Sequence, residues 1–323
     1  MKKKTVYIWV GTIVGLSIIL FSIIYFFQLQ NDAINVANQV HKSSTPKFSY
    51  FYQGDLNDPL DKPMDVAKIG QFVYVTDTNH KRVQVFDSTG TPIFKFGKEG
   101  TGKGQFKFPY GITGDSKGNV YVADLYNEKI SVFTSKGKFI KYFTDANHKE
   151  DFLKSPGGLR IFNEKLYVTD IQSGRVLIYN LDGKKLLEVS SAINKKDRLN
   201  SPNSVAIDED QNLYVSDSGN QRVVVFNKDG KFLRIVNGSK DGKGDSKFVN
   251  PRGIAVEANG TLLMVDNMTH FLYGFDKKGN QVFQVGGLGS DKEQFYLPNG
   301  LNIDEKGEVF ITDTVNARVA LYY

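Results

Sequence analysis

The sequence predicts an all-β fold, a six-bladed β-propeller closed by an N-terminal strand and preceded by one transmembrane α-helix. Three observations predict it. A strand pattern, YVxD or a close variant, recurs six times at intervals of 46 to 49 residues. The last repeat ends at Tyr323 after only three strands. Residues 5–29 form an uncharged, mostly apolar run long enough to span a bilayer.

Each repeat carries the same succession of signals. A proline precedes the aspartate of the pattern by 14 or 15 residues, and a glycine-containing turn follows the third strand. Alternating apolar residues between such turns indicate antiparallel strands, and four strands per repeat of this length are typical of a propeller blade. The aspartates are Asp77, Asp124, Asp170, Asp217, Asp266 and Asp313, and the prolines stand at 63, 109, 156, 202, 251 and 298.

The missing strand of the sixth repeat is expected from the other end of the chain. The segment KFSYFY, residues 47–52, resembles the outer strands of the other repeats. Closing the ring through one mixed blade removes an exposed sheet edge. We therefore expect the propeller to comprise residues 47–323.

The N-terminal segment predicts a membrane anchor. Its apolar run is longer than the roughly 7–15 residues of the apolar region in a cleaved signal peptide, so we expect the run to be retained; a removed signal is the alternative. Three lysines precede the run, which predicts a cytoplasmic N-terminus and a propeller on the outer side of the cell membrane. The expected segments are a cytoplasmic N-terminus at 1–4, a transmembrane anchor at 5–29 and a tether at 30–46.

Charge and composition exclude several classes of function. The net charge is +6, and Lys2, Lys3 and Lys4 supply half of it. The remaining +3 is too mild to indicate a nucleic-acid partner. The chain has no cysteine, which excludes disulfides, thiolate metal sites and a cysteine nucleophile.

The aspartate of each pattern is followed five residues later by Arg or Lys, except in the fifth repeat, where Phe271 stands. Seen once, such a pair suggests a functional site. Because it recurs in repeat after repeat, we interpret it as a charge pair that pins the loop between the second and third strands of each blade. In the fifth repeat Asp266 needs another partner.

Two stretches resemble the NHL-repeat family. They are YVSDSGNQRVVVFNKDGKF, residues 214–232, which is similar to the repeat itself, and FGKEGTGKGQFKFPYGI, residues 96–112, which is similar to the link between blades. The resemblance recurs six times from residue 47 to the end. It implies a propeller that binds protein, peptide, glycan or another polymer through its loop face. The family also includes a lyase of amidated peptides with metal on its propeller.

Candidate binding residues lie where the repeats disagree. The residue directly after each proline is variable. The residue four positions after each proline is small, except for Arg160 and Asn302. The adjoining loops add further polar and aromatic side chains. The alternative is that Arg160 neutralises a neighbouring acid and that the other residues are merely solvated. The candidate ligand patch is Tyr110, Tyr126, Arg160, Asn203, Asn220, Arg252, Asn299, Asn302 and Asn316.

Two classes of function remain. The first is a non-enzymatic binding, scaffold or sensor module outside the membrane, with a protein, peptide or glycan ligand. The alternative is an extracytoplasmic metal-dependent lyase, lactonase or hydrolase with Ca²⁺ or Zn²⁺ in the channel. The histidines of the repeats, His80, His148 and His270, belong to blades that do not form one cluster. The sequence therefore predicts no metal site, no cofactor and no catalytic residue, and it disfavours RNA binding.

Overall fold

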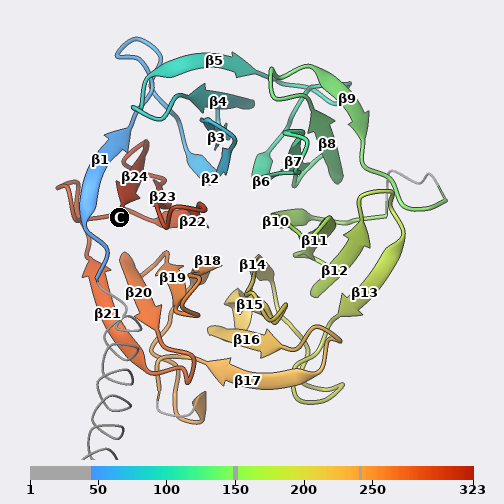
Figure 1. Ribbon diagram of the computed structural model, residues 1–323, viewed down its shortest axis with the longest axis vertical. Coiled ribbons are helices and arrows are strands. Elements are labelled where there is room, and N and C mark those ends of the chain that lie inside the picture. Colours follow the sequence, from blue (N-terminus) through green and yellow to red (C-terminus); the bar gives the residue numbers. More distant parts are fainter. Residues whose placement is uncertain (1–44, 148–151, 240–241) are drawn as a thin grey trace, which may run out of the picture. The chain divides into compact units, whose positions relative to one another are not determined.

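Six four-stranded antiparallel sheets surround a central axis in the computed structural model (Figure 1). The structure describes residues 45–147, 152–239 and 242–323. The innermost strand of every sheet starts at one of the repeat prolines. The prediction of a six-bladed propeller is confirmed.

The blades follow one another along the chain. Blade one contains β2 (Pro63–Ile69), β3 (Phe72–Asp77), β4 (Arg82–Phe86) and β5 (Pro92–Phe96). Blade two contains β6 (Pro109–Gly114), β7 (Val120–Asp124), β8 (Lys129–Phe133) and β9 (Phe139–Tyr142). Blade three contains β10 (Pro156–Phe162), β11 (Lys165–Asp170), β12 (Arg175–Asn180) and β13 (Lys185–Val189).

The second half repeats this order. Blade four contains β14 (Pro202–Ile207), β15 (Leu213–Asp217), β16 (Arg222–Phe226) and β17 (Phe232–Val236), with a short 3₁₀ helix, η1 (Ser218–Asn220). Blade five contains β18 (Pro251–Val256), β19 (Leu262–Asp266), β20 (Phe271–Phe275) and β21 (Gln281–Gly286). Blade six contains β22 (Pro298–Ile303), β23 (Val309–Asp313), β24 (Arg318–Tyr322) and, from the other end of the chain, β1 (Phe48–Tyr52).

The ring closes through β1, as the sequence predicts. This strand pairs antiparallel with β24, with Phe51 opposite Ala320. Beyond the strands, Lys47 and Tyr323 exchange two backbone hydrogen bonds, of 2.8 and 3.0 Å. The Arg318 guanidinium lies 3.7 Å from the centroid of the Phe51 ring. Both ends of the propeller are therefore tied to each other.

The apolar core lies between the blades. One face of blade one, including Val83 and Val85, packs on blade two, while the other face, including Val73 and Phe86, packs on blade six. Because both faces of the middle strands are covered, β4 and its equivalents are apolar along most of their length. The outer strands are only half covered, so β5 alternates between exposed and less exposed residues.

The repeated aspartates pin the blades together at one end. Asp217, fully buried, accepts a hydrogen bond from Arg222 Nε at 2.8 Å and another from the backbone N–H of Asn200, in the link from blade three, at 2.6 Å. The same ion pair forms in blades one, three and six, which confirms the structural interpretation. In blade five Asp266 instead accepts the backbone N–H groups of Val249, Asn250, Met268 and Thr269.

No helix among residues 45–147, 152–239 and 242–323 is long and apolar enough to cross a membrane. The predicted anchor at 5–29, together with residues 1–4 and most of the tether, lies outside the described residues.

Candidate functional site

Successive strands of a blade run in opposite directions, so each blade presents its connections on two faces. The loops between second and third strands and the links between blades lie at one end, where the inner strands begin; we call this the loop face. The turns between first and second strands and the hairpins between third and fourth strands lie at the other end, the hairpin face. The sequence-predicted ligand patch belongs to the loop face and to the channel below it.

Three of the predicted residues meet at the mouth of the channel on the loop face. They are Tyr110, Asn203 and Asn299, from the starts of β6, β14 and β22, three alternate blades around the axis. The Tyr110 hydroxyl donates to Asn203 Oδ1 at 3.0 Å, and Asn299 Nδ2 donates to the backbone carbonyl of Met64 at 2.8 Å. All three predicted residues are buried. We call this cluster the channel plug. Its polar groups form hydrogen bonds with one another and with the inner strands.

A buried ion pair lies deeper in the channel. Arg160 on β10 reaches across the axis, where its Nη2 donates to the backbone carbonyl of Leu301 and its Nη1 lies 3.7 Å from Asp65 Oδ2. Asp65 also accepts the N–H groups of Val66 and Ile112, at 2.9 and 3.0 Å. Burial raises the pKa of the Asp65 carboxyl above its ordinary value, while Arg160 and the two N–H groups act against that rise. Arg160 therefore has the acidic neighbour that the structural alternative requires.

Side chains of the inner strands also accept hydrogen bonds from backbone N–H groups at the strand edges that line the channel. Thr113 Oγ1 accepts the N–H of Ile161 at 3.1 Å, and Asn302 Oδ1 lies 3.5 Å from the backbone nitrogen of Lys68. Unpaired backbone groups at a sheet edge need partners. Asn302 thus joins blade six to blade one.

Arg252 differs from these residues because its side chain does not bond to the inner strands. It is half-buried, at the start of β18, and its guanidinium makes no hydrogen bond or ion pair with any residue in the described part of the chain. Its Nε is buried without a partner. A cation placed in this way is suited to receive an acidic group from a ligand.

The remaining predicted residues lie in the loops between second and third strands. Asn220 and Asn316 each donate to the buried aspartate of their own blade at 2.8 Å, so they help to pin the loops. Tyr126 is 61% exposed, with its ring centroid 4.8 Å from that of Phe108. Of the predicted residues, only Tyr126 and Arg252 therefore make no side-chain hydrogen bond or ion pair with the described residues.

Asp65 was missed by the sequence analysis, although a signal for it exists. Two residues after the repeat proline the other blades have glycine or serine. Glycine suits this position because the inner strands approach closely there, and a Cβ on Gly300 would lie 2.6 Å from Asp65 Cα. An aspartate at a position of this kind departs from the repeat as clearly as Arg160 does.

An exposed apolar patch on the loop face was also missed. Met268 and Val249 both donate a backbone N–H to Asp266, so they are neighbours, and Val315 donates its N–H to the carbonyl of Tyr296. These side chains are between 43 and 53% exposed. Asn267 Nδ2 joins the two pairs by donating to the carbonyl of Pro298 at 3.1 Å. We call Val249, Met268, Tyr296 and Val315 the blade five–six patch.

The histidines of the repeats take structural roles where they are described. His80 Nδ1 lies 2.9 Å from Asp77 Oδ2, and His270 Nδ1 accepts the N–H of Leu297 at 3.2 Å. His148 lies outside the described residues. Within the described ranges, no three His, Cys, Asp or Glu side chains are grouped so that they could hold a metal ion.

Comparison with known proteins agrees with this architecture. Among solved structures, the chain is similar to a gluconolactonase from Xanthomonas campestris, with a TM-score of 0.63 and 16% identity over 86% of this chain and 94% of that one. It is also similar to streptogramin B lyase, with a TM-score of 0.59 and 14% identity over 85% and 97%. At such low identity the likeness concerns the fold alone. The chain is thus a protein of the six-bladed β-propeller class.

The repeat itself can be identified more closely. The NHL-repeat family model matches residues 199–226, which lie in the link before blade four and in that blade. The chain is 47% identical over 49 residues to protein lin-41 of Caenorhabditis elegans, and 42% identical over 50 residues to the E3 ubiquitin-protein ligase TRIM71 of Rattus norvegicus. These matches span 15 and 16% of this chain but only 4 and 6% of those proteins. The propeller therefore carries an NHL repeat.

Proposed function

We propose that this protein is a non-enzymatic binding module, anchored by residues 5–29, whose propeller lies on the outer side of the cell membrane and takes a protein or peptide ligand on its loop face. The observation that carries the proposal is the blade five–six patch. Four apolar side chains in the loops and links of two neighbouring blades are exposed on this face. Exposed apolar groups that gather in this way are typical of interaction surfaces.

A cation near the patch in the sequence indicates that the ligand carries an acidic group. Arg252 lies three residues after Val249 in the sequence and has a guanidinium without a partner in the described part of the chain. An acidic group next to apolar side chains on the ligand would complement this surface, because a guanidinium binds carboxylate in a bidentate manner. The channel plug and Arg160 fill the channel below. A ligand is therefore expected to rest on the loop face.

The proposed location rests on the sequence. An apolar run of this length, preceded by three lysines, favours a retained anchor with its N-terminus inside the cell. The NHL-repeat resemblance favours ligand binding through the loops.

A single-cysteine experiment tests location and binding together. The chain has no cysteine, so Met268→Cys places one thiol in the blade five–six patch of the full chain. Intact cells are treated with a membrane-impermeant reagent that joins a thiol to a nearby amine. We expect a discrete cross-linked product, because the patch is outside the membrane and close to its ligand.

The matched control is Val282→Cys, on the outer strand of the same blade, where the side chain is 45% exposed against 53% for Met268. It should react with an impermeant maleimide as well as Met268→Cys does, but give no discrete product. If neither cysteine reacts until the cells are opened, the proposed location is wrong. If both react and give the same products, the binding surface is wrong.

A further inference from the structure

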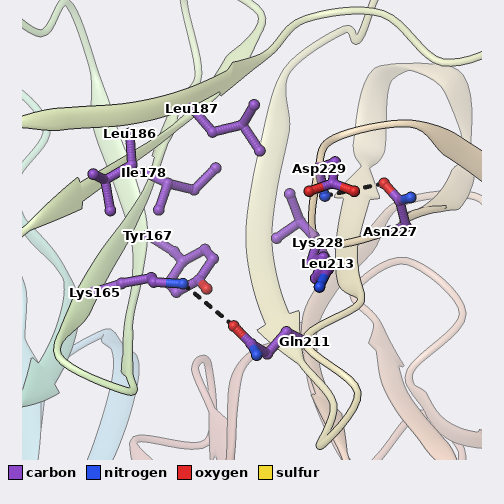
Figure 2. A pocket seen from close by; sticks show the side chains of 10 residues that line it. All are labelled: Lys165, Tyr167, Ile178, Leu186, Leu187, Gln211, Leu213, Asn227, Lys228 and Asp229. Atoms are coloured by element: carbon purple, nitrogen blue, oxygen red, sulfur yellow. Dashed lines mark hydrogen bonds between the residues drawn. The ribbon is translucent and has the colours of Figure 1, made fainter.

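A groove opens between blades three and four on the hairpin face, away from the loop face (Figure 2). Its volume is about 270 Å³, near the lower end of the range for small-molecule sites, roughly 300–1,000 Å³. Apolar side chains line its inner part, and polar side chains from the Gln211 turn and the hairpin at 227–229 line its rim. The aliphatic lining residues are Ile178, Leu186, Leu187 and Leu213.

One tyrosine hydroxyl that opens into the groove has no partner in the described part of the chain. Tyr167 is only 6% exposed, yet its hydroxyl makes no hydrogen bond within the described part of the chain. Burial raises the pKa of this hydroxyl, so it remains a donor at neutral pH. The other tyrosines at this repeat position all donate: Tyr74 to the Ser135 carbonyl at 2.8 Å, and Tyr121 and Tyr214 to Asp115 and Asp208, each at 3.3 Å.

The space that matches the groove is filled by two aromatic rings in blade one. Between blades one and two, the Phe72 and Phe94 rings pack 6.3 Å apart. Lys165 and Leu187 stand at the corresponding positions of blade three, as counted from the repeat aspartate and from the strand register. The loss of two rings leaves space in front of Tyr167, whose hydroxyl is not bonded to the next hairpin as that of Tyr74 is.

The rim carries an excess of positive charge. Lys165 Nζ donates to Gln211 Oε1 at 3.3 Å, a neutral acceptor (Figure 2). Among the described residues, no carboxylate forms an ion pair with Lys165 or Lys228, and Asp229 is the one acidic residue that lines the groove. Two ammonium groups and a free hydroxyl donor beside an apolar floor are complementary to an anion with an apolar body.

We propose that this groove binds a small monocarboxylate with an apolar body. The Tyr167 hydroxyl donates a hydrogen bond to the carboxylate, which also faces the Lys165 ammonium. The apolar body packs against Ile178, Leu187 and Leu213. The site is independent of the loop face, because it lies at the opposite ends of the strands.

Calorimetric titration of the full chain in a nonionic detergent tests this proposal, with hexanoate and benzoate as probes and their uncharged amides for comparison. At least one of the acids should bind to a single saturable site, and its amide should bind about tenfold or more weakly, since it lacks the charge that faces the ammonium group. Tyr167→Phe should weaken binding of the acid by a similar factor, because a hydrogen bond to a charged group is lost. Its melting temperature should stay unchanged, because the hydroxyl has no partner in the protein.

The matched control is Tyr74→Phe, the same change at the same repeat position. It should lower the melting temperature and leave binding intact, because that hydroxyl is bonded to Ser135. Leu187→Phe, which introduces the residue found in blade one, should fill the groove and abolish binding without destabilising the fold. The proposal is overturned if neither acid binds, if the amide binds as tightly as its acid, or if Tyr167→Phe binds as tightly as the native chain.

Discussion

The charged residues of the channel show how single departures from a repeat can support each other. Arg160 stands where the other blades have alanine, threonine or asparagine, and Asp65 stands where they have glycine or serine. Each alone would place an isolated charge in the channel, where desolvation is costly. Together they lie 3.7 Å apart and bond to the inner strands of blades one, two and six. They act as a cross-brace of the ring.

Removing one partner should therefore cost more than removing both. Arg160→Ala introduces the side chain of blades one, four and five but leaves the Asp65 carboxyl buried without its cation, so we expect a loss of about 3–5 kcal/mol in the free energy of unfolding. Adding Asp65→Ser, the residue of blade four, should recover at least half of that loss. Urea unfolding of the two variants measures this. Equal losses in both would show that the pair does not act as a unit.

The same residues show what could be predicted at this scale. Comparing the repeats identified Arg160 as an outlier and left open that it neutralises an acid. The same comparison picked Asn203 and Asn299 as variable, but it did not show that they bond to Tyr110, because three alternate blades meet only in the folded ring. The exposure of Met268 and Val315 could not be predicted either. Both follow buried aspartates, and the repeat does not indicate which way their side chains face.

At the scale of elements, the strands follow their pattern closely and the connections differ. Every inner strand starts at its proline and every second strand ends at its aspartate, because alternation and turns specify the register. The links vary in length and contacts. The link from β1 to β2 is held by Asp58, whose carboxylate accepts bonds from Lys95 Nζ at 2.7 Å and Arg82 Nη1 at 2.9 Å.

This link should make a measurable, pH-dependent contribution to stability. The bonds from Lys95 and Arg82 lower the pKa of Asp58 from 3.8 to about 2. A lowered pKa in the folded state stabilises the fold above the unfolded value, and this stabilisation is lost as the pH falls towards 2. Asp58→Asn should therefore reduce stability by about 0.2–1 kcal/mol near neutral pH, as for other partly exposed pairs. The difference in the free energy of unfolding between Asp58→Asn and the native chain should shrink as the pH falls from about 4 to 2.

Urea midpoints across this pH range measure the effect, and Asp55→Asn in the same link is the control, because its exposed carboxyl makes no hydrogen bond or ion pair with the described residues. A difference for Asp58→Asn that stays constant with pH would contradict the assignment of the stabilisation to this carboxylate.

At the scale of the whole molecule, closure follows from the count of strands. The twenty-four strands of the described residues make six complete blades only when β1 joins β24. The sequence predicted this because one end lacks a strand and the other supplies one. It could not predict the open groove between blades three and four, since the period describes what the repeats share, and the groove arises from side chains in which they differ.

Closure can be tested by locking the ring with a disulfide between its two ends. Lys47 and Tyr323 are both exposed and form a hydrogen-bonded antiparallel pair, whose Cα atoms lie about 5.5 Å apart, within disulfide reach. The chain has no other cysteine. Lys47→Cys with Tyr323→Cys should oxidise within one molecule and stabilise the propeller by about 2–4 kcal/mol, because the bond closes a loop of nearly the whole domain. Reduction should remove the gain, and Lys47→Cys alone should show none. If the double variant forms only intermolecular disulfides, the two ends are not paired in solution and the ring is closed in another way.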